Sequence, residues 1–192
     1  RAPAIDGSAE AVGLHLDEQS PARRPLATIA AATEQGNELV RGLMTFGRRA
    51  AYRPEAVDLV ELTERTYGIV GHSLPATIEV SLDVPTTAGP FVLGDPVQLQ
   101  QALMNLILNA RHAMPDGGRI TVRLRRCVAV HGPMACIDVE DTGSGMAPEV
   151  QARIFEPFFS ARTDERTGTG LGLAIVHGVV TRHGGVVRCV SA

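Results

Sequence analysis

The sequence predicts an α+β fold: an antiparallel sheet covered on one face by helices, with a helical hairpin in front of it. Three segments, at 77–84, 119–126 and 134–141, alternate apolar and polar residues as half-buried strands do. Runs with apolar residues three and four apart lie before, between and after them, as in amphipathic helices. Because each element has one apolar face, a two-layer packing of helices on a sheet buries these faces most simply.

Residues 1–52 are expected to form part of the helical hairpin. Residues 9–16 have the pattern of a short helix, and Ser20 followed by Pro21 is a typical start for the next one. From 26 to 50 the apolar positions form a stripe on one helix face. A hairpin this short cannot bury its stripe alone, so we expect a homodimeric helical bundle or packing against the second domain.

The second domain is expected over residues 53–192. A linker is expected at 50–57, before the first helix of this domain. Asp58 and Glu61 have the spacing of a capping box, which predicts a helix that ends near Ser73. The periodic run at 96–114 predicts a long helix that stops at the turn sequence Pro-Asp-Gly-Gly.

Shorter elements are expected in the last third of the chain. A helix follows Pro148, and another begins at Leu171 and is capped by Gly184. Residues 186–192 have the pattern of a strand that begins as the sequence ends.

Composition narrows the classes of function. The net charge of −3 gives no electrostatic footprint for nucleic acid. We expect no signal peptide, and the sequence has no apolar run of about 18 residues. We therefore expect a cytoplasmic segment without membrane contact, which is compatible with a membrane anchor elsewhere in a parent protein. The three cysteines have no metal-like spacing, which predicts reduced, mostly structural thiols.

Two asparagines stand out in the long helix. Asn105 and Asn109 are four residues apart, so a helix places both side chains on one face, beside an apolar face that includes Leu103 and Ile107. They are either surface or capping residues, or their amide oxygens bind a hard cation and its phosphates. A carbonyl oxygen suits Mg²⁺, which shares the phosphate oxygens of a nucleotide.

A strand is expected to end on Asp141, with Gly143 and Gly145 after it. This pattern is either an ordinary turn or part of a pocket. In the pocket, the carboxylate accepts a hydrogen bond from an amino group such as that of adenine. A glycine there lets a flat ring approach the backbone.

The most distinctive segment is the glycine-rich turn that opens the last helix, with Gly168, Gly170 and Gly172 two residues apart. Such a turn lets backbone N–H groups face an anion, and the helix N-terminus adds its positive dipole end. The spacing, and the polar loop in front of it, argue against a dinucleotide-binding fingerprint. That loop follows an apolar cluster around Phe155 and Phe158 and is either a plain connection or a lid.

The segments "NLILNARHAM", "EDTGSGM", "IFEPFFSAR" and "GTGLGLAIVHGVV" resemble, in order and spacing, the N, G1, F and G2 boxes of bacterial sensor histidine kinases. The resemblance spans roughly residues 20–190. It implies a Bergerat-type sandwich with a mixed, mostly antiparallel sheet, as in the superfamily that includes gyrase, Hsp90 and MutL. Residues 1–52 then resemble part of the dimerisation and phosphotransfer hairpin, and the last strand of the 53–192 domain is expected to be cut short.

The resemblance also implies ATP and Mg²⁺ as cofactors. Asn109 matches the Mg²⁺-binding asparagine, Asn105 a phosphate-side asparagine, and Asp141 the adenine-binding aspartate. Arg162 stands where many relatives carry a lid lysine, and His112 is either a phosphate contact or a helix-surface histidine. The other implied ATP-binding positions are Gly143, Gly145, Gly168, Thr169, Gly170, Leu171 and Gly172.

The implied reaction is phosphoryl transfer. Gyrase-like ATPases carry a glutamate one turn before the metal-binding asparagine, where this chain has Asn105, and an amide cannot act as a general base. The implied acceptor is a histidine on the first hairpin helix, with relay to a response-regulator aspartate. Two alternatives stay open: a phosphotransfer module with a vestigial ATP site, and a gyrase- or Hsp90-like conformational ATPase.

The acceptor histidine itself is not found. The family motif is a histidine followed directly by an acidic residue, whereas Leu16 follows His15. We therefore expect the acceptor at or before Arg1, and no labelling of this chain by its own activity.

Overall fold

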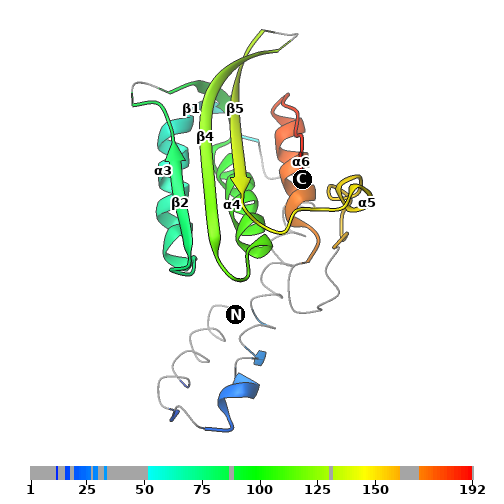
Figure 1. The fold of residues 1–192 in the computed structure, drawn as a ribbon. Coiled ribbons are helices and arrows are strands. Elements are labelled where there is room, and N and C mark those ends of the chain that lie inside the picture. The colour runs from blue at the N-terminus through cyan, green and yellow to red at the C-terminus, as the bar shows by residue number, and fades with distance from the viewer. Residues whose placement is uncertain are drawn as a thin grey trace.

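A computed structural model describes residues 12, 16–17, 20–26, 28–29, 33, 52–86, 89–129, 132–160 and 169–191 of the chain (Figure 1). Residues 23–26 are helical, and the Ser20 hydroxyl accepts a hydrogen bond from the backbone N–H of Ala22 at 3.3 Å, as expected of a helix start. His15 and most of the predicted hairpin stripe lie outside the described residues.

The main sheet has the strand order β2-β4-β5, with β2 (Ile78–Asp83), β4 (Gly118–Ala129) and β5 (Gly132–Asp141). β2 pairs parallel with β4, and β4 pairs antiparallel with β5, so the sheet is mixed as predicted. The alternation along β4 is also confirmed, because Ile120, Val122 and Leu124 are buried. The sheet and its helices match the expected α+β sandwich.

A second, two-stranded sheet was not expected. β1 (Glu55–Asp58) pairs antiparallel with β3 (Phe91–Gly94), so the predicted linker at 50–57 contains a strand. Strands of four residues are too short to show a clear alternation, and the partners are far apart in sequence. Asp58 ends β1 and then caps α3 (Leu59–Val70), accepting a hydrogen bond from the N–H of Val60 at 2.8 Å.

The remaining helices follow the predicted positions closely. A 3₁₀ turn, η1 (Gly71–Ser73), continues α3 to the expected end. The long helix α4 (Pro96–Ala113) is capped by Asp95, whose side chain accepts from two backbone N–H groups. The short α5 (Pro148–Gln151) and the last helix, α6 (Gly172–Arg182), complete the set, and Gly184 follows α6 with φ +72°.

Helix α4 is the common element of two apolar clusters. Leu103, Ile107 and Ala110 of α4 pack in the main core between the sheet and α3. Ala102, on another face of α4, packs against α6 through a cluster completed by Leu171, Ile175, Val176 and Val179. Figure 1 shows α3 and α4 behind the sheet, with α6 beside α4. The helix that carries the asparagine pair is thus fixed on two sides.

Two further predictions are wrong in the described part of the chain. Residues 186–191 form no strand, and hydrogen bonds join this segment to the loop that follows Asp141 and to α5. The Met146 N–H donates to the Ser191 hydroxyl at 2.7 Å, and the Gln151 amide donates to the Cys189 carbonyl at 2.9 Å.

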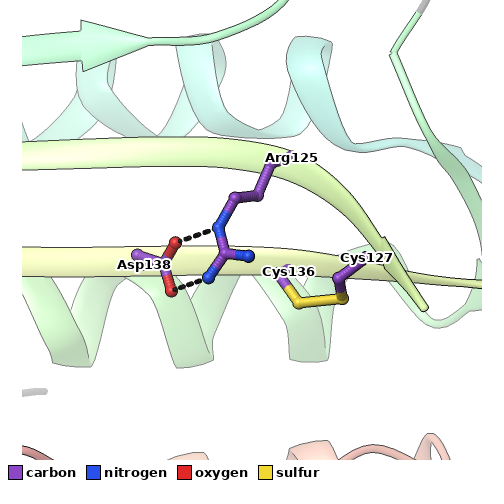
Figure 2. The surroundings of a disulfide bond; sticks show 4 residues. All are labelled: Arg125, Cys127, Cys136 and Asp138. Carbon is purple, nitrogen blue, oxygen red and sulfur yellow. Dashed lines mark hydrogen bonds and ion pairs between the residues drawn. A yellow bond between two sulfur atoms is a disulfide. The ribbon is translucent and has the colours of Figure 1, made fainter. Parts of the chain in front are cut away.

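The second error concerns the cysteines. Cys127 and Cys136 form a disulfide between β4 and β5, with Cα atoms 6.2 Å apart (Figure 2), and only Cys189 is a free thiol. The hairpin register places Cys127 opposite Met134, so Cys136 is its diagonal neighbour. The spacing of the cysteines along the chain does not reveal this pair, because the pairing depends on the register of the hairpin.

Among the described helices, none has both the length and the hydropathy needed to cross a bilayer.

Candidate functional site

The two asparagines of α4 meet the start of α6. A Cβ atom placed on Gly172 would lie 3.4 Å from Asn109 Nδ2 and 3.9 Å from Asn105 Cγ. Both amides therefore lie on one face, as the helical spacing predicted, and that face abuts the first residue of α6. The sequence could not show which element this face contacts.

Within the part of the chain that the structure describes, the amide nitrogens of this pair have no hydrogen-bond partner. Among the side-chain atoms of the described residues, Asn105 Nδ2 and Asn109 Nδ2 are buried without a hydrogen bond. Leaving a buried donor unsatisfied costs about 1–3 kcal/mol, and native structures contain few such groups. Two neighbouring donors that lack acceptors fit a ligand with negatively charged oxygens. A phosphate chain has this chemistry.

The N-terminus of α6 also favours a negatively charged ligand. Leu171, the N-cap residue, makes no side-chain capping bond to the first turn. The unpaired N–H groups and positive dipole end of a helix favour an anion at this position. Leu171 itself is 2% exposed, so its side chain anchors the turn in the α4–α6 cluster and only its backbone is available to a ligand.

The turn after Asp141 contacts Ala113, the last residue of α4. Asp141 Oδ1 accepts from the Gly143 N–H at 2.9 Å, and the Ser144 N–H donates to the Ala113 carbonyl at 3.2 Å. A Cβ on Gly143 would lie 2.7 Å from both Ala113 Cβ and its carbonyl oxygen. The end of α4 therefore packs directly against this glycine. The sequence had suggested that a flat ring would occupy this space.

The glycine-rich turn is joined to the preceding aromatic segment. Gly170 has φ +67°, and a Cβ there would lie 2.6 Å from the backbone carbon of Phe158. The Phe158 N–H donates to the Gly170 carbonyl at 3.0 Å, and Phe158 itself has φ +64°. The hydroxyl of Thr169 accepts from the Leu171 N–H at 3.4 Å. Only glycine fits at position 170.

These contacts connect all four predicted segments. Helix α4 contacts α6 at Gly172 and the Asp141 turn at Ala113, while the aromatic segment contacts the glycine turn. His112 lies half-buried on α4, three residues after Asn109, and Gly145 has φ +67°. Arg162 and Gly168 lie outside the described residues, so the predicted roles of their positions stay predictions.

One neighbour of the site gave no signal in the sequence. Burial raises the pKa of the Cys189 thiol, a hydrogen bond from Gln151 opposes this, and the negative charge of Asp141 raises the pKa further. The Met146 N–H also donates to the Ser191 hydroxyl, so the last described segment lies near the loop that follows Asp141. Local patterns cannot show this, because the two positions are far apart in sequence.

The comparisons with known proteins converge on one family. The model of the histidine kinase-, DNA gyrase B-, and HSP90-like ATPase family matches residues 94–192. The chain is 37% identical over 164 residues to the sensor kinase CckA of Brucella abortus, which covers 80% of this chain. It spans only 17% of CckA and 34–38% of other curated sensor kinases that it matches.

Solved structures give the same result. The mycobacterial sensor histidine kinase MprB is 35% identical, with a TM-score of 0.59 over 69% of this chain and 81% of that one. The histidine kinase ThkA, solved in complex with the response regulator protein TrrA, has a TM-score of 0.69 over 95% of this chain and 51% of that one. At 20% identity, the latter supports the fold alone.

Proposed function

The chain belongs to the histidine kinase-, DNA gyrase B-, and HSP90-like ATPase family, and from this we propose that it is the catalytic core of a sensor histidine kinase. The core binds ATP and transfers the γ-phosphoryl group to a histidine of a two-component system. The observation that carries the proposal is the pair of buried, unpartnered amide donors, Asn105 and Asn109, at the N-terminus of α6.

Asn105 favours transfer to a protein acceptor over hydrolysis. An amide cannot take a proton from water at neutral pH, so the position one turn before Asn109 supplies no general base. The site then works by orientation and by neutralising charge on the phosphates. The acceptor is an imidazole nitrogen, whose lone pair attacks the γ-phosphorus while the bond to the ADP leaving group breaks. No proton has to leave the attacking nitrogen, so this step does not need a base at position 105.

We assign the residues as follows. Asn109 holds Mg²⁺ through its amide oxygen, and Asn105 donates to the phosphates. Asp141 uses Oδ1 for its own turn, so Oδ2 accepts the adenine amino group. The bound Mg²⁺ supplies charge neutralisation at the phosphate oxygens. We also assign Arg162 as the lid cation that contacts the phosphates, and His112 as either a phosphate contact or a helix-surface histidine. The remaining backbone contacts are assigned to Gly143, Gly145, Gly168, Thr169, Gly170, Leu171 and Gly172.

The partners follow from the same assignment. We propose a homodimer through the hairpin of residues 1–52, an acceptor histidine on a hairpin helix, and a response-regulator receiver domain that takes the phosphoryl group. ThkA, whose fold this chain shares, was solved in complex with the response regulator protein TrrA. We propose a cytoplasmic catalytic region, which a parent protein can tether to a membrane.

The test is transfer from γ-labelled ATP to a supplied hairpin that contains the acceptor helix. We expect acid-labile label on the hairpin with the parent chain and near-complete loss with Asn109→Ala. Gln100→Ala is the matched control, because it removes an amide from the same helix on a side away from the pair.

The other outcomes identify the alternatives. Rapid hydrolysis without transfer would indicate a conformational ATPase. No measurable ATP binding by calorimetry would indicate a phosphotransfer module with a vestigial site. Label on His15 of the chain itself would place the acceptor inside this sequence.

A further inference from the structure

His183, the C-cap residue of α6, bridges two helices by hydrogen bonds in which each ring nitrogen has a definite role. Its Nε2 accepts from the backbone N–H of Asp95 at 2.9 Å, and its Nδ1 lies 2.8 Å from the Val179 carbonyl oxygen. A carbonyl only accepts, so Nδ1 carries the hydrogen, and Nε2 must offer a lone pair. The arrangement therefore requires the neutral ring with its proton on Nδ1.

The residue at the other end of this bond is the start of α4. Asp95 is 8% exposed and caps α4 through Oδ1, which accepts from the N–H groups of Val97 and Gln98. Its Oδ2 accepts from the side chain of Gln98 at 3.2 Å and from the Arg53 N–H at 3.4 Å. Its own N–H has His183 as acceptor, although the two residues are 88 positions apart.

The imidazole ring also packs in a fixed position. A Cβ on Gly94 would lie 2.7 Å from His183 Cδ2, so the ring lies directly against this backbone. Tyr52 meets the ring edge-on with centroids 5.2 Å apart, and the Arg182 guanidinium lies over Tyr52 at 4.9 Å. Because of these contacts, the ring occupies a single position against the junction of β3 and α4.

The bridge lies at the opposite end of the helix pair from the asparagines. His183 ends α6 and meets the start of α4, whereas Gly172 begins α6 and meets Asn109 near the end of α4. The two helices are therefore antiparallel, and about 16 Å of helix separates the bridge from Gly172. Between them lies the apolar cluster, whose attraction is non-directional and does not fix an axial position by itself.

We propose that His183 is a positioning residue for nucleotide binding. Its neutral imidazole fixes the axial position of α6 along α4, and thereby the distance between the first N–H groups of α6 and the amides of Asn105 and Asn109. This inference rests on the proposed function, because the anion held between those groups is the phosphate chain of a nucleotide.

Two polar substitutions test the roles of the two ring nitrogens separately. His183→Gln places an amide oxygen near the position of Nε2 and keeps an acceptor for the Asp95 N–H. His183→Asn is one carbon shorter, so it keeps a group near Nδ1 but cannot reach Asp95. Each variant is measured for Kd of a non-hydrolysable ATP analogue with Mg²⁺ and for transfer to the supplied hairpin. The temperature is one at which circular dichroism shows both variants to be folded.

We expect His183→Asn to weaken nucleotide binding about tenfold and to slow transfer by about 10–100-fold, because a displacement of about 1 Å at a distant contact has effects of this size. His183→Gln should stay within about threefold of the parent in both. A purely structural role would lower Tm in both variants and leave Kd unchanged below the melting range. That result, or equal losses in the two variants, would overturn the inference.

A second measurement does not depend on the variants. In ¹⁵N-labelled parent protein, the His183 imidazole should show a protonated Nδ1 and an unprotonated Nε2 at neutral pH. A protonated Nε2 would contradict the bridge. If the parent chain binds no nucleotide at all, the proposed function fails; if it binds and His183→Asn binds equally well, only the positioning role fails.

Discussion

The outer face of the sheet and the contact between α4 and α6 differ in whether their polar groups have partners. On the sheet, Arg119, Arg123 and Arg125 of β4 each pair with a carboxylate of a neighbouring strand, at 3.0, 2.8 and 2.8 Å. Between α4 and α6, two amide nitrogens are buried without a hydrogen-bond partner among the residues that the structure describes. The exposed charges are paired within the protein, whereas the buried amide nitrogens have no acceptor among the described residues.

This difference separates stability from function. The ion pairs are exposed, so each contributes little to folding, and water can replace either partner. The buried amide nitrogens destabilise the ligand-free fold, because buried atoms do not contact water and no atom of the described residues accepts their hydrogens. A fold retains such groups where a ligand uses them. Substitutions in the two regions should therefore have opposite effects on stability and on activity.

The largest effect is expected at Asn109. Asn109→Ala should lower phosphoryl transfer by more than about hundredfold, because the metal and phosphates lose their placement together. Tm should stay the same or rise, since the change removes a buried donor without a partner. Labelled transfer and calorimetry measure the two quantities. A clear fall in Tm with transfer retained would show that the amide is structural.

The disulfide gives the converse effect. Reducing Cys127–Cys136, or replacing both residues with serine, should lower Tm by about 5–10 °C, because closing a loop of about ten residues is worth about 2–3 kcal/mol. Nucleotide Kd below the melting range should not change. A Kd that changes on reduction would connect the hairpin to the site and break the comparison between the two regions.

Cys189 tests the environment of the site by its reactivity. Burial and the Asp141 charge raise the pKa of this thiol, so less thiolate is present at a given pH than for an exposed cysteine. Alkylation without reductant should modify this residue alone, and its rate should rise at higher pH than that of a model thiol. A rate profile that matches the model thiol would place Cys189 in open solvent, away from Asp141.

The smallest effect is expected at the Arg125–Asp138 pair, shown in Figure 2. The hydrogen bond and the negative charge of the neighbouring Asp138 carboxylate raise the pKa of Arg125, yet both side chains of the pair are exposed to water. Asp138→Asn should change Tm by about 1 °C or less and leave transfer unchanged. A fall comparable with that from reducing the disulfide would mean that this surface pair is coupled to the core.

The sequence predicted whatever depends on local periodicity. Helical spacing placed Asn105 and Asn109 on one face, and alternation identified the three strands of the main sheet. It failed where the structure depends on contacts between distant residues. The disulfide depends on hairpin register, β1 and β3 are too short to show a pattern, and the bond from Asp95 to His183 joins positions 88 residues apart.

Glycines show the same limit. The sequence indicated that Gly143 permits a close approach, but the approaching group is Ala113 of α4. A pattern can show that a Cβ is not tolerated, while the identity of the neighbour requires coordinates.

The most direct test of the central claim is a crystal structure of the chain with a non-hydrolysable ATP analogue and Mg²⁺. We predict phosphate oxygens within hydrogen-bonding distance of Asn105 Nδ2 and the first N–H groups of α6, the metal on Asn109, and the adenine amino group at Asp141. A nucleotide bound elsewhere, with both amide nitrogens still unpaired, would contradict the account.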